Sequence, residues 1–226
     1  MPMQMKLDLR TCGILLGVLL ALYSAWFLAA ELFRPRLDPA FRFPAAIQNS
    51  KIKPIRSAAG LAATLGIIRG DLWAERVLLD AAKILNERDS PDDALPQKQS
   101  EEIRVIAERA VADAPLSSPV WLVLATLTYK AGPQPLTSEQ LKMSYYTGPN
   151  DKALMGRRLA LVSRFQSIED PVLRNAIRRE IRTILLRAPD LRQSVISAYR
   201  DAQPEARKFI EATVSEVDPT FLPRLR

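Results

Sequence analysis

Hydrophobic and polar residues follow a helical period over most of the chain, and one uninterrupted apolar run stands near its start. Residues Thr11 to Ala30 contain no charge, and a helix of that length spans roughly 30 Å, the hydrocarbon thickness of a bilayer. From about residue 57 onward, apolar residues recur at helical spacing, without a strand pattern. The pattern predicts an all-α protein, in which an N-terminal transmembrane helix precedes a stack of antiparallel helical hairpins.

Glycine, proline and capping residues mark the expected helix ends. Ser100 is expected to cap a helix, and Asp170-Pro171 and either Asn150 or Asp151 to open two others. Gly132 and Gly148 each precede a proline, and Gly148 is expected to adopt a left-handed cap. These signals divide the chain into the following regions: an N-terminal tail (1–10), a transmembrane helix (11–31), a Pro-rich basic linker (32–56), an α-helical domain (57–217) and a C-terminal tail (218–226).

The apolar run has two interpretations, an uncleaved anchor and a cleaved signal peptide. We favour the anchor, because the run is long for a signal peptide and Leu28 occupies the −3 position before a cut after Ala30. Basic residues flank the run on both sides in nearly equal number, so charge decides its orientation weakly. A short tail before a long domain is the usual signal-anchor layout. We therefore expect a single-pass protein of the bacterial inner membrane, with its C-terminal domain in the periplasm and the basic linker at the lipid headgroups.

Small residues recur at every fourth position of the apolar run and form a shallow ridge. Such a ridge lets a second helix approach closely, which favours a homodimer or contact with a partner's span. The ridge consists of Gly13, Gly17, Ala21, Ala25 and Ala29.

Composition removes several kinds of chemistry. The 226 residues include no histidine, one cysteine and 8 glycines, which excludes His-based triads, Cys-cluster metal sites and glycine-rich phosphate loops. We predict no cofactor, no metal and no catalytic residue. The enzyme alternative is a hydrolase or transferase that uses carboxylates only. The paired acids Asp92-Asp93 and Glu101-Glu102 fall in a loop and at an exposed helix start, where acidic residues are ordinary.

Residues 115–149 resemble a tetratricopeptide repeat. The two prolines at its ends are 34 residues apart, the length of that repeat. The matching positions are Trp121, Leu124, Ala125 and Gly132 in the first helix and its turn, and Leu141, Ser144 and Pro149 in the second. Tyr129 falls one place late and Thr137 stands where alanine is usual. The resemblance implies about four stacked hairpins with imperfect end caps; an unrelated helical bundle is the alternative.

The resemblance also implies a binding surface. Residues 70–156 carry a net charge of −4 and residues 157–226 a net charge of +5, so basic side chains gather in the C-terminal half. Lys130 and Arg164 occupy equivalent repeat positions that tend to face the concave groove of such stacks, where cations hold carboxylates of a peptide. We predict partner contacts from Tyr129, Lys130, Arg157 and Arg164. A solvated basic face remains open for these residues and for the row Arg174, Arg178 and Arg182.

These observations predict a membrane-anchored, non-catalytic scaffold or adaptor, which binds an anionic protein or peptide partner in the cell envelope. Analogy with anchored repeat proteins suggests a role accessory to polysaccharide assembly or export. Nucleic acid is disfavoured, because the chain has an anchor and its basic residues lack interleaved aromatics. A structural membrane oligomer, assembled through the small-residue ridge, is the alternative.

Overall fold

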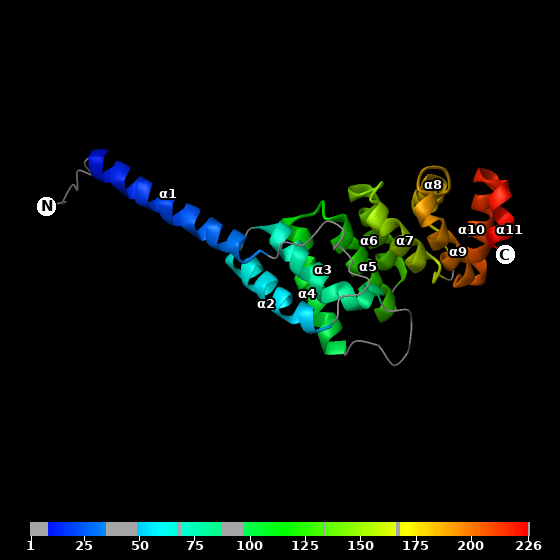
Figure 1. Ribbon diagram of the computed structural model, residues 1–226, viewed down its shortest axis with the longest axis horizontal. Helices are drawn as coiled ribbons and strands as arrows, with labels where there is room; N and C mark the ends of the chain where they lie inside the picture. The colour runs from blue at the N-terminus through cyan, green and yellow to red at the C-terminus, as the bar shows by residue number, and fades with distance from the viewer. Residues whose placement is uncertain are drawn as a thin grey trace.

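The computed structural model describes residues 9–34, 49–66, 69–86, 97–132, 134–165 and 168–225. Within these ranges all regular structure is helical and no strand occurs, so the all-α prediction is confirmed. The elements are α1 (Leu9–Leu32), α2 (Asn49–Leu65), α3 (Gly70–Asn86), α4 (Gln97–Asp113), α5 (Ser118–Ala131), α6 (Gln134–Thr147), α7 (Lys152–Val162), α8 (Pro171–Arg187), the 3-10 turn η3 (Pro189–Leu191), α9 (Arg192–Arg200), α10 (Pro204–Val217), the 3-10 turn η4 (Pro219–Phe221) and α11 (Leu222–Leu225). Helix α1 projects from one end of the molecule, and the C-terminal helices lie at the other end (Figure 1).

Several helix ends follow the expected local chemistry. The side chain of Asp151 caps α7 by accepting the N–H of Ala153. Asp170 caps α8, with Pro171 in the first helical position. Gly132 ends α5 with a φ of 115°, a left-handed conformation that glycine adopts without strain.

Other ends differ from the expected ones. Helix α4 begins at Gln97, so Ser100 lies in its first turn and does not cap it. The left-handed cap expected at Gly148 is wrong, since among the described residues Gly132 alone has a positive φ. A Cβ at Gly148 would instead lie 2.7 Å from the side chain of Ser118, so this glycine permits close packing of α6 against α5.

The predicted linker and tail ranges both contain helix. Helix α2 begins at Asn49, inside the range 32–56, whereas residues 35–48 lie outside the described part of the chain. Residues 219–225, which the sequence suggested were a tail, form η4 and α11. Phe221 and Leu225 are buried there, and burial of a large apolar side chain contributes about 1.5–3 kcal/mol.

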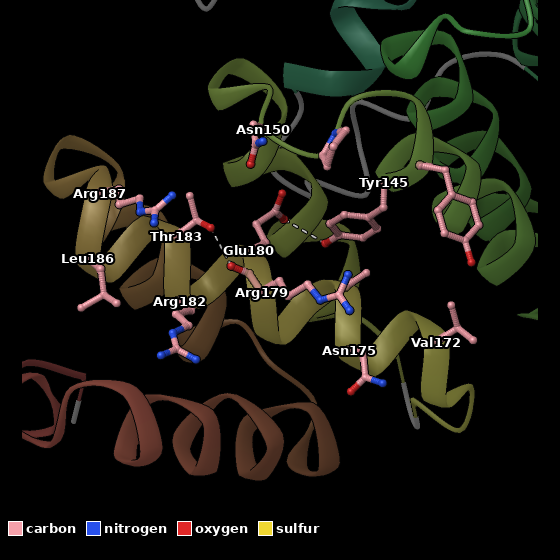
Figure 2. A pocket seen from close by; sticks show the side chains of 13 residues that line it. Tyr145, Asn150, Val172, Asn175, Arg179, Glu180, Arg182, Thr183, Leu186 and Arg187 are labelled. Atoms are coloured by element: carbon pink, nitrogen blue, oxygen red, sulfur yellow. Dashed lines mark hydrogen bonds between the residues drawn. The ribbon is translucent and has the colours of Figure 1, made fainter.

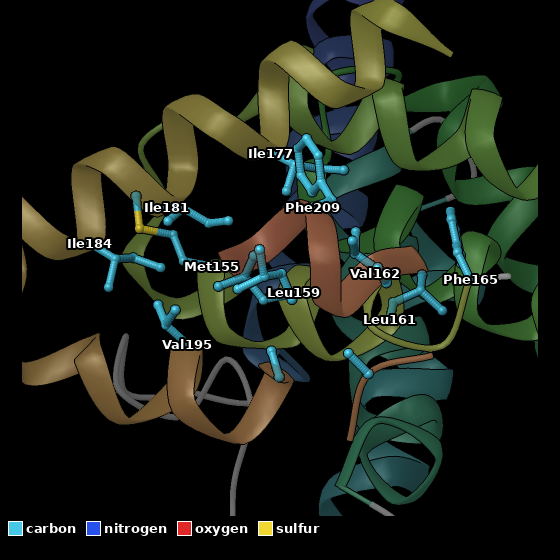
Figure 3. Packing of buried hydrophobic residues seen from close by; sticks show 14 of the residues in the cluster. Met155, Leu159, Leu161, Val162, Phe165, Ile177, Ile181, Ile184, Val195 and Phe209 are labelled. Atoms are coloured by element: carbon cyan, nitrogen blue, oxygen red, sulfur yellow. The ribbon is translucent and has the colours of Figure 1, made fainter. Parts of the chain in front are cut away.

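Helix α5 lies between two hydrophobic clusters and contributes to both. Val123 and Leu127 belong to the cluster that α5 forms with α3 and α4. Leu122 and Ala125 belong to a larger cluster formed with α6 to α11, much of which is shown in Figure 3. Side chains on every face of α5 are therefore buried, as expected for a central helix. Helix α5 packs most extensively against α6, whereas α7 packs against α9 more than against α8.

Helix α1 is long and apolar enough to cross a membrane. Its segment Arg10–Leu32 has 23 residues, a mean hydropathy of 2.1 and none of its most apolar window buried. A signal sequence would meet the same criterion. The end of α1 is packed on the helical domain, since the indole Nε1 of Trp26 donates a hydrogen bond to the carbonyl of Leu65 at 2.7 Å.

The small-residue ridge of α1 lies on the side opposite to this contact. At 100° per residue, the ridge centres nearly half a turn away from Tyr23, Trp26 and Phe27. A Cβ added at Gly13 or Gly17 would meet no other atom within 4 Å. The ridge is thus exposed from Gly13 to Ala25, whereas Ala29 at its end is partly buried.

Candidate functional site

A groove of about 610 Å³ lies between the end of α6 and the outward face of α8 (Figure 2). The α6 side supplies Tyr145 and Tyr146, and the following turn supplies Pro149 and Asn150. Helix α8 supplies the remaining lining residues over nearly its whole length: Val172, Asn175, Ala176, Arg179, Glu180, Arg182, Thr183, Leu186 and Arg187. The groove falls within the range of 300–1,000 Å³ that is usual for ligand sites.

Helix α8 presents the groove residues because its opposite face is fixed in the core. Leu173, Ile177, Ile181 and Ile184 are all buried and pack in the C-terminal cluster (Figure 3). Since successive residues rotate by about 100°, Arg179, Arg182 and Leu186 fall on the other side of the helix, where they are exposed. The sequence of α8 therefore determines which of its side chains line the groove.

The floor of the groove is a hydrogen-bonded pair, Tyr145 and Glu180 (Figure 2). The hydroxyl of Tyr145 donates to Oε1 of Glu180 at 2.8 Å. The second carboxylate oxygen, Oε2, accepts a hydrogen bond from Nη1 of Arg158 at 3.2 Å. Glu180 is 2% exposed and Arg158 is 0% exposed, so this ion pair is withdrawn from water.

The guanidinium of Arg158 joins α7 to three other helices. Its Nη2 donates to Oγ of Ser118 at 2.7 Å and to the carbonyl of Gly148 at 2.9 Å, and its Nε donates to Oγ of Ser144 at 3.1 Å. Its central carbon lies 4.7 Å from the centre of the Tyr145 ring. Because a buried ion pair is tolerated only when its remaining donors are satisfied, this network explains how α5, α6, α7 and α8 hold two buried charges.

Burial raises the pKa values of both residues that form the floor, Glu180 and Tyr145. Burial raises the pKa of Glu180 to about 7, although the charge of Arg158 and the hydrogen bond from Tyr145 both act to lower it. Burial, together with the nearby charge of Glu180, raises the pKa of the Tyr145 hydroxyl well above its usual value. A neutral Glu180 is tolerable here, since the charge of Arg158 also faces carbonyls, hydroxyls and an aromatic ring. Among the described lining residues Glu180 is the sole carboxylate, whereas hydrolysis by paired carboxylates needs two.

The rim of the groove is basic and partly apolar. Arg179 and Arg187 are exposed, and Arg182 stands beside them on α8 (Figure 2). Tyr146 is 62% exposed and Leu186 is 57% exposed. Arginines can hold carboxylates by paired hydrogen bonds, and exposed aromatic and aliphatic side chains supply apolar area. The arrangement suits an anionic ligand with apolar groups.

The four predicted contact residues lie elsewhere. The hydroxyl of Tyr129 donates to the carbonyl of Arg164 at 2.9 Å, and its ring stacks on Phe165 with centres 5.9 Å apart. Tyr129 thereby joins the end of α5 to the turn after α7. Lys130 is exposed, and burial lowers the pKa of Arg157 to about 10, which leaves it protonated at neutral pH. None of the four lines the groove, and their role in binding stays a prediction.

The predicted arginine row of α8 divides between two surfaces. Arg174 and Arg178 lie over the ring of Phe209 on α10, at 5.4 and 5.9 Å from its centre. Arg182 lies in the groove. Residues four apart drift by about 40° around a helix, so a row read from the sequence does not stay on one face.

The sequence analysis missed Arg158 and Glu180. One signal was available for the acid, since Glu180 interrupts an otherwise apolar row of α8 at Leu173, Ile177 and Ile184. A charged residue in a core-facing row requires a buried partner of opposite charge. Nothing in the local sequence distinguishes Arg158 from its neighbour Arg157 as that partner.

Within the described residues, no three Cys, Asp or Glu side chains are grouped so that they would hold a metal ion. Comparison of the chain with protein-family models, with curated proteins and with solved structures gave no match. The site is therefore interpreted from its own chemistry.

Proposed function

We propose that this protein is a membrane-anchored, non-catalytic scaffold or adaptor, which binds an anionic protein partner in the groove between α6 and α8. The observation that supports it is the rim, where Arg179, Arg182 and Arg187 line the same groove as the exposed side chains of Tyr146 and Leu186. Buried aromatic, aliphatic and arginine side chains are the usual anchors of a protein interface. The Arg158–Glu180 network below the groove keeps its floor rigid.

The anchor is α1, and we propose the bacterial inner membrane as its location, with the helical domain in the periplasm. The layout supports this, because the helical domain lies on the C-terminal side of α1, as in a signal anchor. Figure 1 shows the groove helices α6 and α8 well away from α1. In a membrane, the groove would be held clear of the lipid, where a partner in the envelope can reach it.

A tetratricopeptide-like stack is the finer structural proposal. Four of the residues that carry the resemblance are buried, Leu124 at 1% and Ala125, Leu141 and Ser144 at 0% exposure, and Trp121 is partly buried against the cluster of α3, α4 and α5. Helices α5 and α6 are each other's most extensive contact. Helices α7 and α8, which would form the next hairpin of the stack, support the proposal less, since α7 packs mainly against α9.

The proposed function is tested by photo-crosslinking in intact membranes. We replace Tyr146, in the groove, by the photoreactive residue p-benzoylphenylalanine, and as a matched control Leu116, which is 79% exposed on the turn between α4 and α5. We expect position 146 to crosslink to one discrete protein. Position 116 should not crosslink to that protein. Arg182→Glu should reduce the Tyr146 adduct at least ten-fold, the scale of a lost charge pair in an interface.

The same experiment separates the groove from the surface predicted from the sequence. A triple variant, Lys130→Glu with Arg157→Glu and Arg164→Glu, should leave the Tyr146 adduct intact. Loss of the adduct in the folded triple variant, with no loss in Arg182→Glu, would move the binding site to the α5–α7 surface. Absence of any protein adduct from Tyr146 would contradict the proposed function.

A further inference from the structure

The outward face of α8 carries a second row of residues at the spacing of a helix-packing seam. Val172, Ala176, Arg179, Thr183 and Leu186 follow one another at intervals of four, three, four and three. This alternation keeps side chains on one face and is the pattern by which one helix packs along another. All five residues line the groove.

The inner row of α8 has the same spacing and is covered by other helices of the protein. Leu173, Ile177, Glu180 and Ile184 have the same spacing, and each is at most 2% exposed. In the outer row, by contrast, Val172 is 45% exposed and Leu186 is 57% exposed. The described part of the chain therefore leaves the two ends of the outer seam open, while Ala176 and Thr183 between them are partly buried.

We propose that the occupant of this seam is an acidic amphipathic α-helix of the partner protein, lying along α8; this inference rests on the proposed function. Val172 and Leu186, the ends of the seam, are 14 positions apart, which is about 21 Å or four helical turns. The partner helix presents apolar residues to the two ends of the seam and a carboxylate to Arg179 at its centre. Arg182 and Arg187 flank the seam on its two sides and attract further acidic residues.

The groove favours a helix over an extended peptide, because none of its lining residues belongs to a strand. Extended peptides gain affinity by pairing with a sheet edge, whereas most of the groove lining comes from helices, whose main-chain groups bond within the helix. A helical ligand satisfies its own main chain in the same way. It then needs only side-chain contacts, which the seam supplies.

Position along the molecule argues against a second copy as the occupant. The acidic face of α4, with Glu101, Glu108 and the 55% exposed Val105 between them, would suit the seam chemically. However, α4 lies near the α1 end of the molecule and α8 lies toward the far end (Figure 1). Two copies anchored by α1 in one membrane hold these helices at different distances from the bilayer. The charge and position of the seam therefore indicate a different protein.

The inference is tested by measuring how far apart two crosslinked residues lie in the sequence of the partner. We place p-benzoylphenylalanine at Val172 in one variant and at Leu186 in another, in the full-length chain in native membranes, and map the crosslinked partner residues by mass spectrometry. A helical partner places the two crosslinked residues about 14 positions apart, with acidic residues between them. An extended partner places them about six apart, because a strand advances about 3.4 Å per residue.

A matched pair of charge reversals completes the test. We expect Arg179→Glu to reduce the adduct from Leu186 at least ten-fold. Lys208→Glu, on an exposed lysine of α10 outside the groove lining, should leave it within two-fold. A separation near six, a captured segment without acidic residues, a lipid adduct, or an equal effect of both reversals would overturn the inference. If Tyr146 still captures a protein in those cases the proposed function stands, and if no groove position captures one both proposals fail.

Discussion

Two clusters of arginines and carboxylates within the described residues, one at the junction of α1 with α3 and one beside the groove, differ in their access to water. At the junction of α1 with α3, Arg69 pairs with Glu31 at 2.8 Å and Asp71 at 2.6 Å. Glu31 and Asp71 have side chains that are nearly half exposed. Near the groove, Arg158 pairs with Glu180, and neither side chain is more than 1% exposed.

The difference shows that the number of ion pairs does not measure their importance. Exposed pairs contribute about 0–1 kcal/mol each, since water and salt already screen the charges. A buried pair gives little net stability when intact, but removal of one partner leaves an uncompensated charge. The loss of one residue at the junction therefore costs little stability. The loss of Arg158 or Glu180, by contrast, leaves a charge or a polar group buried under the groove without its partner.

The largest expected effect is the loss of Arg158. Arg158→Met leaves Glu180 without its cation and the serine and glycine oxygens around it without a donor. We expect the free energy of unfolding to fall by about 3–5 kcal/mol, measured by chemical denaturation of the full-length protein in detergent. The double variant Arg158→Met with Glu180→Leu should recover part of the loss, because it removes the uncompensated carboxylate while the serine and glycine oxygens still lack their donor. Equal losses in the single and double variants would contradict this account.

The next largest effect is a dependence of stability on pH that comes from Glu180. Its pKa is raised by burial from 4.5 to about 7 in the folded protein, so the folded state binds this proton more tightly than the unfolded state does. The stabilisation is therefore fully present below pH 4.5 and is lost as pH rises through 7, by about 3 kcal/mol for this group. Chemical denaturation between pH 5 and 8 measures it, with Glu180→Gln as the reference. An advantage of the wild type over Glu180→Gln that grows with pH would show that the attraction of Arg158 outweighs burial.

The sequence predicted local features of this fold better than long-range ones. Asp151, Asp170 and Gly132 act within one helical turn, so their roles as caps could be predicted from neighbouring residues. The apolar run of α1 could likewise be predicted from consecutive residues alone. By contrast, the helical content of 219–225 depends on burial of Phe221 and Leu225 against distant helices.

The candidate site depended almost wholly on long-range contacts. Arg158 and Glu180 are 22 positions apart, and Ser118 is 40 positions from Arg158. Their pairing follows from the packing of four helices, which no local pattern specifies. Tyr129 is predicted to contact a partner because of its position in the repeat. In the structure its hydroxyl instead donates a hydrogen bond to the carbonyl of Arg164.

The smallest expected effect is at the junction of α1, α2 and α3. Arg69→Ala removes an arginine whose side chain is 20% exposed and which bonds to both Glu31 and Asp71, so we expect a local loss of about 1 kcal/mol. Hydrogen exchange of amides in α2 and α3 should accelerate about five-fold at low salt. The difference should shrink at 1 M salt, where charges are screened beyond about 3 Å. Arg104→Ala removes ordinary exposed pairs with Glu101 and Glu108 on α4 and serves as the matched control, with a smaller effect on the amides of α4 than Arg69→Ala has on those of α2 and α3. A loss at Arg69 as large as that at Arg158 would mean that this junction, despite its exposure, holds the molecule together as strongly as the buried pair.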